Sequence, residues 1–251
     1  MEGLGYDFTV NTTMSNFTKP ELIRYSRQLM LPEVGLKGQE KFKNAKVLVI
    51  GAGGLGCPVL QYLSAAGIGT IGIVDFDTIE LHNLHRQILY SAADIGRAKT
   101  TVAVEKLTQQ NPHTVFHEHN TLLHERNVDE LIQAYDLVMD GSENFETRYL
   151  VNDTCVKFNK PLVYGSIFKF EGQAAVFNYK GSKQLRDIYA EAPHPEDVPN
   201  CSEVGVIGAV PGLIGTLMCT MAFEIIQERF TAFNTLHVFN FKEYSIQKLT
   251  F

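Results

Sequence analysis

Several features that mark special protein classes are missing from this chain of 251 residues. Its four cysteines, at positions 57, 155, 201 and 219, form no C-x-x-C pair, so their spacing indicates neither a disulfide framework nor a zinc ribbon. No apolar run approaches the length that spans a bilayer. The first fifteen residues also lack the basic and apolar segments of a signal peptide. We therefore expect a cytoplasmic protein that does not enter a membrane.

The chain also lacks an excess of positive charge. Its formal net charge of −6 argues against non-specific binding to nucleic acid or to an anionic membrane surface. Hydrophobic residues make up 45% and charged residues 20%, which is typical of a globular protein. We expect a flexible tail at residues 1–16, with Met14 as a possible second start, and one domain at residues 17–251.

The most informative stretch is Lys46–Cys57, in which a short apolar strand runs into Gly51, Gly53 and Gly56. This G-x-G-x-x-G spacing suits a tight turn that lets a phosphate approach backbone N–H groups. The helix that follows offers free amides and the positive end of its dipole. Asp75 stands nineteen residues after Gly56, at the end of the next apolar strand, where a carboxylate can bind ribose hydroxyls. The stretch therefore predicts a nucleotide site, and taken alone it favours a nicotinamide or flavin enzyme.

Apolar strands and helices alternate along residues 45–166, which we take as the nucleotide-binding part. This pattern predicts an α/β fold with a Rossmann-like, mostly parallel sheet and helices on both faces. Beyond it we expect a crossover loop at about 180–203, then a C-terminal helix and hairpin within 204–251. The sheet should thus continue into antiparallel C-terminal strands. Ligands of such sheets bind at the carboxyl ends of the strands.

Basic and amide residues cluster after the second predicted strand. Asn83, Arg86, Gln87 and Lys99 would converge near its carboxyl end, and such donors suit a triphosphate better than a dinucleotide pyrophosphate bridge. After the fourth predicted strand come three more candidates, whose carboxylates could hold Mg²⁺ against those phosphates. These residues are Asp140, Glu143 and Asn144.

Ordered motifs then identify a resemblance that covers about residues 17–251. They are R-Y-x-R-Q at 24–28, V-L-V-I-G-A-G-G-L-G-C at 47–57, V-D-F-D at 74–77, L-H-R-Q at 84–87, I-G-x-x-K at 95–99 and N-P-H at 111–113. Together they resemble the ThiF/MoeB/HesA family, the bacterial relatives of ubiquitin-activating enzymes. The resemblance implies adenylation by Mg-ATP of the C-terminal glycine carboxylate of a small ubiquitin-like sulfur carrier protein ending in Gly-Gly, with release of pyrophosphate.

The resemblance also implies roles for single residues. Arg86 and Lys99 would stabilise the transferring phosphate, Arg27 would reach the active site from the other subunit of a homodimer, and Glu143 would hold Mg²⁺. The full set of expected nucleotide-binding residues is Gly51, Gly53, Gly54, Gly56, Asp75, Asp77, Asn83, Arg86, Gln87, Lys99 and Asn144.

Two departures from the family stand out. Glu143 occupies the position of an Asp, which adds a methylene and changes the reach toward a metal of strict geometry, so Asp140 could share the role. The two C-x-x-C pairs that hold a structural zinc in typical members are missing, so we expect no zinc. His117, His119 and His124 form the rival metal cluster, which alternation on a strand makes more consistent with a polar surface.

Cys201 matches a cysteine on the crossover loop of some members, where it can link to the carrier or transfer sulfur. A thiolate on an exposed loop could attack an acyl-adenylate, although an ordinary loop cysteine is an equal alternative. No rhodanese-like domain is visible, so we expect a separate sulfur donor. Two other functions stay open: an NAD(P)-dependent oxidoreductase on the same fold, and a non-catalytic nucleotide-binding scaffold.

Overall fold

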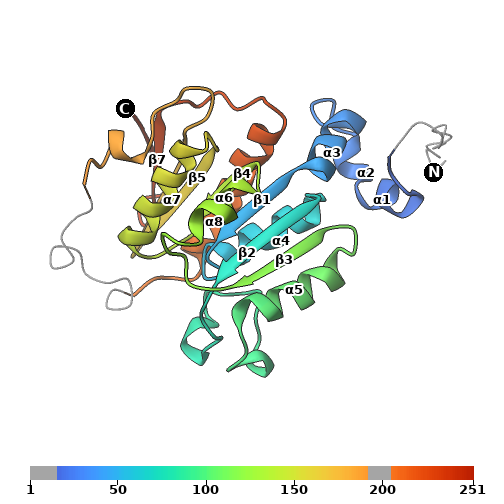
Figure 1. The fold of residues 1–251 in the computed structure, drawn as a ribbon, viewed down its shortest axis with the longest axis horizontal. Coiled ribbons are helices and arrows are strands. Elements are labelled where there is room, and N and C mark those ends of the chain that lie inside the picture. Colours follow the sequence, from blue (N-terminus) through green and yellow to red (C-terminus); the bar gives the residue numbers. More distant parts are fainter. Residues whose placement is uncertain (1–15, 192–204) are drawn as a thin grey trace.

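A mixed sheet of eight strands runs through the part of the chain that this computed structural model describes, residues 16–191 and 205–251 (Figure 1). The strand order is β3-β2-β1-β4-β5-β6-β7-β8. The strands are β1 (Lys46–Ile50), β2 (Thr70–Asp75), β3 (Val115–Asn120), β4 (Leu137–Asp140), β5 (Leu162–Phe168), β6 (Glu171–Phe177), β7 (Thr235–Asn240) and β8 (Ser245–Thr250). The helices are α1 (Lys19–Arg24), α2 (Ser26–Leu29), α3 (Gly35–Asn44), α4 (Gly56–Ala66), α5 (Lys99–Gln110), α6 (Val128–Gln133), α7 (Phe145–Lys157) and α8 (Ala209–Ile226).

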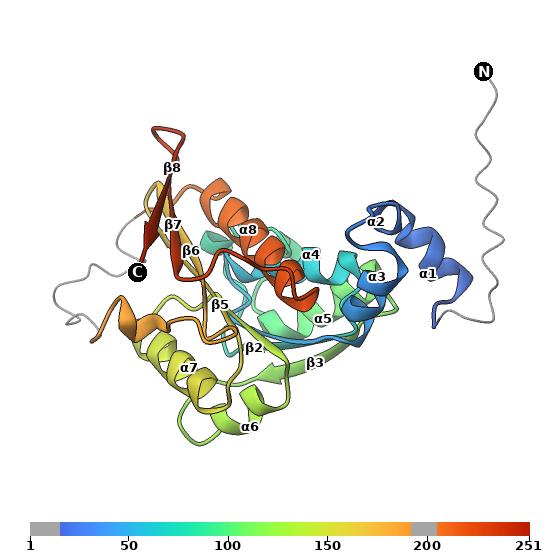
Figure 2. The same cartoon turned by 90° about the horizontal axis from the view of Figure 1, so that it is seen from above.

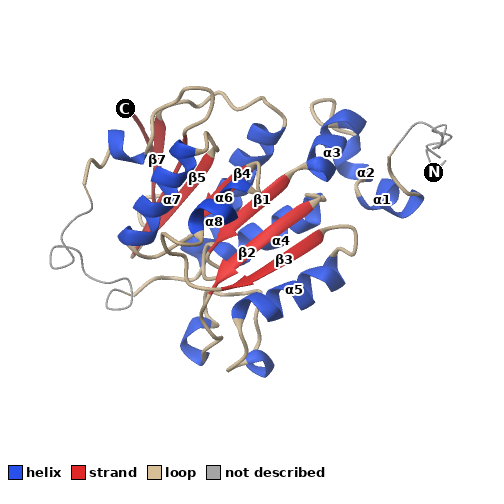
Figure 3. Cartoon of the chain, viewed as in Figure 1, coloured by secondary structure: helices blue, strands red, loops and turns tan. Residues whose placement is uncertain are grey.

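Strands β3, β2, β1, β4 and β5 are parallel, and helices cover both faces of this half of the sheet (Figures 2 and 3). Helices α4, α5 and α8 lie on one face, and α6 and α7 lie on the other. Along β1, Val47 and Val49 enter one apolar cluster while Leu48 and Ile50 enter the second. This alternation with a period of two residues explains why a strand buried on both faces reads as a continuous apolar run. The predicted fold class is confirmed.

The sheet becomes antiparallel from β5 to β8, as predicted for the C-terminal strands. Helix α8 packs against β5, β6 and α4. By length and composition it could cross a membrane, which corrects the expectation that no apolar run approaches that length. Half of the residues of this helix are buried inside the fold.

The N-terminal segment forms three helices. The chain breaks at Tyr25 between α1 and α2, and α3 forms although Gly35 and Gly38 are weak helix formers. Gly38 has a packing reason, since a Cβ there would lie 3.2 Å from Gln227 Oε1.

The chain order places a topological switch point between β1 and β4. From β1 the chain continues to β2 and β3 on one side, and then returns to β4 on the other. Ile50 at the end of β1 is in register with Val74 and with Asp140, so the loops that leave β1, β2 and β4 start at the same edge. Such an edge is where open α/β sheets bind ligands.

Candidate functional site

A cavity of about 700 Å³ opens at the carboxyl ends of the parallel strands. This volume is within the range of small-molecule sites in proteins. Ten residues expected from the sequence to bind nucleotide or metal line it: Gly51, Gly53, Asp75, Asp77, Asn83, Arg86, Gln87, Lys99, Glu143 and Asn144. The structure therefore brings together side chains that are spread over more than ninety positions of the chain.

The glycine loop after β1, residues 51–56, lines the cavity through Gly51 and Gly53. Gly51 has φ of 88°, a conformation that glycine adopts without strain, and its N–H donates to Val74 O at 2.8 Å. Gly56 does not line the cavity but starts α4, and a Cβ on it would lie only 2.0 Å from Gly51 O. Gly54 also lies outside the lining and faces Pro211 of α8. Gly56 and Gly54 thus permit close packing, while Gly51 and Gly53 face the cavity.

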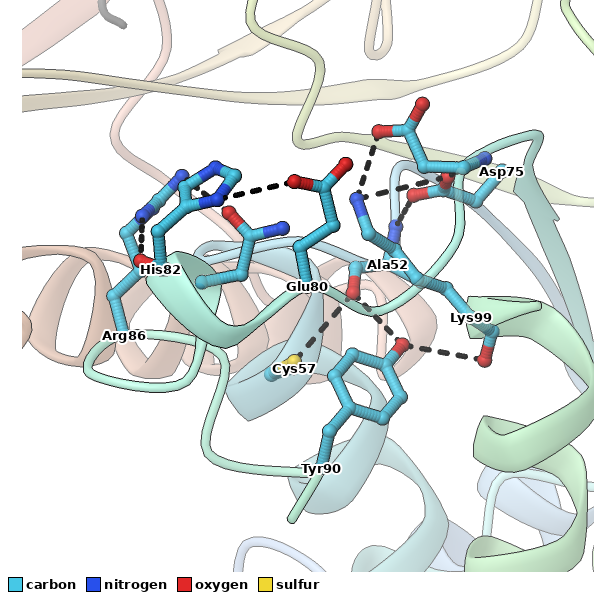
Figure 4. A network of polar contacts seen from close by, with 10 residues as sticks. Ala52, Cys57, Asp75, Glu80, His82, Arg86, Tyr90 and Lys99 are labelled. Carbon is cyan, nitrogen blue, oxygen red and sulfur yellow. Dashed lines mark hydrogen bonds and ion pairs between the residues drawn. The ribbon is translucent and has the colours of Figure 1, made fainter. Parts of the chain in front are cut away.

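Asp75 ties this loop to β2 (Figure 4). Its Oδ2 accepts from Ala52 N–H at 2.7 Å and its Oδ1 accepts from Asp77 N–H at 2.8 Å. Burial raises the pKa of Asp75 above its ordinary value, while the nearby Lys99 acts against that rise. Each carboxylate oxygen has a second lone pair, so Asp75 can also accept from a hydroxyl of a ligand.

Lys99 is the first residue of α5 and its side chain is almost fully buried. Its Nζ donates to Asp77 Oδ2 at 2.8 Å and lies 4.0 Å from Asp75 Oδ1. Tyr90 supports the same corner, because its hydroxyl donates to Ala52 O at 2.9 Å (Figure 4). The ammonium group is therefore fixed at the cavity wall between two carboxylates.

Arg86, Asn83 and Gln87 approach the glycine loop from the segment after β2. Arg86 Nη2 donates to Asn83 Oδ1 at 3.0 Å, and Arg86 makes no ion pair with any carboxylate of the described residues. Gln87 is buried, and its Oε1 has no hydrogen-bond partner in the described part of the chain. The guanidinium suits an anionic ligand, whereas the free Gln87 Oε1 is an acceptor that suits a donor group such as a hydroxyl.

Glu143 and Asn144 lie on the loop after β4 and line the same cavity as Arg86. Glu143 is exposed, makes no hydrogen bond with the described residues, and its Oε1 lies 3.8 Å from where a Cβ on Gly53 would be. Asn144 caps α7 by accepting from Thr147 N–H at 2.7 Å. An uncommitted carboxylate beside the glycine loop is a fitting oxygen ligand for Mg²⁺.

Asp140 differs from Glu143. It does not line the cavity, it is fully buried, and its Oδ1 accepts from Ser142 N–H at 2.9 Å. Burial raises the pKa of Asp140, and the charge of Arg148 opposes this. In this arrangement Asp140 supports the loop after β4 and Glu143 is the carboxylate that faces the cavity.

Arg148 lines the cavity and was not recognised in the sequence. Its Nη2 donates to Ser142 O at 2.9 Å, and its Nη1 donates to Ser166 Oγ at 2.9 Å and to Tyr164 Oη at 3.1 Å. The available signal was its position four residues after Asn144 on a helix, which puts the two side chains on the same face. Other lining residues that sequence reasoning missed are Glu80, His82, Thr147 and Lys169.

Three further candidates lie away from the cavity or outside the described residues. Arg27 is exposed on α2, near the amino ends of the strands (Figure 1), and does not line the cavity of its own chain. His117 Nδ1 and His119 Nε2 both lie within 3.3 Å of Tyr135 Oη, and the described residues contain no group of three side chains suited to a metal.

Cys201 lies outside the described residues. The other three cysteines are buried, and burial raises the pKa of Cys57 to about 12.

Comparison with known sequences gives a consistent result. A sequence profile described as the ThiF family matches residues 25–251. A sulfur carrier protein adenylyltransferase of Thermus thermophilus is 46% identical over 215 residues, which cover 84% of this chain and 79% of the relative. The probable adenylyltransferase/sulfurtransferase MoeZ of Mycobacterium tuberculosis is 47% identical over 216 residues, which cover 84% of this chain and 55% of MoeZ. A probable molybdopterin-synthase adenylyltransferase of Porphyra purpurea is 46% identical over 215 residues, which cover 84% of this chain and 56% of the relative. The chain thus spans about half the length of several curated relatives.

Solved structures share the fold. Escherichia coli MccB superposes with a TM-score of 0.81 at 22% identity, covering 93% of this chain and 71% of MccB. PaaA superposes with a TM-score of 0.79 at 15% identity, covering 100% of this chain and 77% of PaaA. The arrangement of the sheet and its helices is therefore one that experiment has observed.

Proposed function

Since the chain belongs to the ThiF family, we propose that it is an adenylyltransferase that uses ATP to activate the C-terminal glycine carboxylate of a small ubiquitin-like sulfur carrier protein. The observation that carries this proposal is the cavity at the β1/β4 switch point. There Arg86, Lys99 and Glu143 line the same cavity as the glycine loop. The 46% identity to a sulfur carrier protein adenylyltransferase supports the substrate class.

The chemistry follows from charge. An oxygen of the glycine carboxylate attacks the α-phosphorus of ATP, a new P–O bond forms, and the bond to the β-phosphate oxygen breaks to release pyrophosphate. The attacking group, the α-phosphate and the leaving group are all anionic, so the site must neutralise and align them. Arg86 and Lys99 bring two cations to the cavity that the glycine loop lines, and these cations can neutralise the anionic groups. Asp75 would accept from the ribose hydroxyls.

Mg²⁺ would be held by Glu143 and by phosphate oxygens of ATP. The ion would neutralise charge on the phosphates when bound. Asn144 keeps its amide N–H groups available, because only its Oδ1 is used to cap α7. Asp140 would act through the loop rather than as a ligand, because its carboxylate is enclosed by protein.

The active enzyme is proposed to be a homodimer. Helix α2, which carries Arg27, lies near the amino ends of the strands (Figure 1), and Arg27 does not line the cavity of its own chain, so we propose that it serves catalysis in the cavity of a partner subunit. We further propose a cytoplasmic enzyme that receives sulfur from a separate donor, without nucleic acid or membrane as partners. The role of Cys201 in a covalent link to the carrier stays a prediction.

An exchange assay tests the proposal. Purified protein, Mg-ATP, labelled pyrophosphate and a ubiquitin-like carrier ending in Gly-Gly should give labelled ATP, and a carrier that lacks its last glycine should give none. The first rival is an NAD(P)-dependent oxidoreductase, and reduction of NAD⁺ without exchange would favour it. The second rival is a nucleotide-binding scaffold, which ATP binding without exchange on thiamine-type and molybdopterin-type carriers would favour.

A further inference from the structure

Two sequence motifs have no place in the cavity. They are R-Y-x-R-Q at residues 24–28 and N-P-H at residues 111–113, and none of their residues lines it. The first motif surrounds Arg27 on α1 and α2, and the second follows directly after α5. They are more than eighty positions apart in the sequence, and the structure brings them into contact.

Asn111 connects the motifs. Its Nδ2 donates to Tyr25 Oη at 2.9 Å and to Ser64 O of α4 at 2.6 Å, and both Asn111 and Tyr25 are buried. Arg24 adds a second link, because its Nη1 donates to Gln110 O at 3.0 Å. The hydroxyl of Tyr25 and the last turns of α4 and α5 are thus joined by one amide side chain.

Gln28 fixes the other side of Arg27. Its Nε2 donates to Ala66 O at 3.1 Å and to Gln39 Oε1 at 2.7 Å. Gln39 is fully buried and donates to the same Ala66 O at 2.8 Å. Helix α2 therefore rests on the carboxyl end of α4 through hydrogen bonds on both sides of Arg27.

Gly67 makes room for this contact. It has φ of 86° and ends α4, and a Cβ on it would lie 2.5 Å from the Tyr25 ring. Its left-handed conformation and the close approach of the ring both require glycine.

Arg27 itself is exposed, and its Nη1 donates a weak hydrogen bond to Met30 Sδ at 3.6 Å. Helix α2 has only four residues, too few to form a stable helix alone. The position of the Arg27 backbone is therefore set by its anchored neighbours. Helices α4 and α5, on which α2 rests, both begin beside the cavity, which Leu55 at the N-cap of α4 and Lys99 at the start of α5 line.

We propose that Tyr25, Gln28 and Asn111 are positioning residues that hold α2 so that Arg27 reaches the active site of the partner subunit. This inference rests on the proposed function, in which Arg27 acts across a homodimer. A residue far from the reacting atoms matters because a displacement of about 1 Å can lower a rate about 100-fold. The signature of such a role is that a change at Asn111 damages the site of the partner and spares the site of its own chain.

The test uses dimers in which the two chains carry different variants and different affinity tags. Full-length chains are co-expressed and purified on both tags, so that each dimer holds one of each. We expect the N111A homodimer to lose pyrophosphate exchange roughly 100-fold. A dimer of N111A with R86A should recover about half of the wild-type exchange, because one of its two sites has an intact cavity and a correctly held Arg27. A dimer of N111A with R27A should stay at the low level, since neither site then receives a working Arg27.

The opposite pattern, recovery with R27A and none with R86A, means that Asn111 acts within its own cavity and overturns the inference. Wild-type exchange in the N111A homodimer overturns it as well. If N111A does not fold, Y25F replaces it, because this variant removes one hydroxyl but keeps the ring against Gly67. Y25F is then paired with R86A and with R27A, and the same results are expected as for N111A. Hydrogen exchange of the Ser26–Leu29 amides should rise in either variant while that of the α4 amides is unchanged.

A reference dimer separates this inference from the proposed function. R27A paired with R86A should recover about half of wild-type exchange. If it recovers and N111A with R86A does not, only the positioning role fails. If the reference dimer does not recover, Arg27 does not act across subunits, and the positioning role fails with it while adenylation stands. No exchange by the wild type contradicts adenylation itself.

Discussion

The two ends of the parallel strands use polar groups in opposite ways. At the carboxyl ends, Arg86 makes no ion pair with a described carboxylate and Glu143 is free of hydrogen bonds within the described residues. At the amino ends, the amides of Asn111 and Gln39 are fully buried and donate to backbone or side-chain oxygens. The first end keeps hydrogen-bonding capacity for a ligand, and the second uses that capacity within the fold.

This difference separates chemistry from stability. A buried amide that loses its partner costs free energy of unfolding, about 1–3 kcal/mol. A charged group that faces an open cavity costs little free energy of unfolding, because water can form the hydrogen bonds that the protein does not provide. Substitutions at the cavity should therefore alter catalysis with little change in stability, whereas substitutions at the anchored end should alter both.

The largest effect is expected for Arg86→Ala at the cavity. Removing a cation that faces the transferring phosphate should lower exchange on the order of 10³-fold, which is about 4 kcal/mol of transition-state stabilisation. The free energy of unfolding should fall by only about 1 kcal/mol, because the variant loses the hydrogen bonds of Arg86 to Asn83 Oδ1 and His82 O but no ion pair within the described fold. Exchange kinetics and urea unfolding measure the two quantities. A loss of stability as large as the loss of activity would remove the contrast between the two ends.

Gly67→Ala tests the anchored end. A non-glycine residue in the left-handed region costs about 1–2 kcal/mol, and a Cβ 2.5 Å from the Tyr25 ring adds a clash of about 1–3 kcal/mol. We expect a loss of about 2–4 kcal/mol in the free energy of unfolding, measured in urea. Gly181→Ala is the matched control, because Gly181 has φ of 80° but no atom within 4 Å of the added Cβ. Equal losses in both variants would mean that the Tyr25 contact adds nothing.

The sequence alone predicted the carboxyl end better than the amino end. Parallel register brings the ends of β1, β2 and β4 to one edge, so residues that follow an apolar strand can be assigned to one site without knowing side-chain positions. Asp75, Arg86 and Glu143 were found in this way. Asp140, the last residue of its strand, could not be told from them, because the sequence does not show which face of a fully buried strand has room for a ligand.

The residues that were missed depend on contacts between distant segments. A helical arginine such as Arg148 reads as a surface charge until Ser142 and Tyr164 are seen to enclose it. The contact of Asn111 with Tyr25 joins residues 86 positions apart, and no local pattern indicates it.

Asp77→Asn tests whether the cavity end is partly blocked by its own charges. The Asp77 carboxylate pairs with Lys99 at 2.8 Å and would compete with a phosphate for that ammonium group. Since the Asp77 side chain is half exposed, its competition should be modest, and the variant should bind ATP about two- to fivefold more tightly. Calorimetric titration with ATP measures this affinity. Weaker binding in D77N would instead assign Asp77 a direct attractive role toward the nucleotide.

The smallest effect concerns Asp94, a carboxylate in the 3₁₀ turn Ala92–Asp94 that is already used within the fold. Its hydrogen bond with Lys106 is the main reason that its pKa is lowered from 3.8 to about 2, and Ser91 contributes. Because the pKa is lower in the folded state, Asp94 stabilises the fold above pH 3.8, and this contribution is lost as the pH falls from 3.8 toward about 2. Asp94→Asn should therefore be less stable than wild type by about 0.5–1 kcal/mol at pH 6, and the difference should shrink toward pH 2. Urea unfolding across this pH range measures it, and Lys106→Ala should reproduce the same loss of pH dependence. A constant difference at all pH values would show that Asp94 contributes through packing and not through its charge.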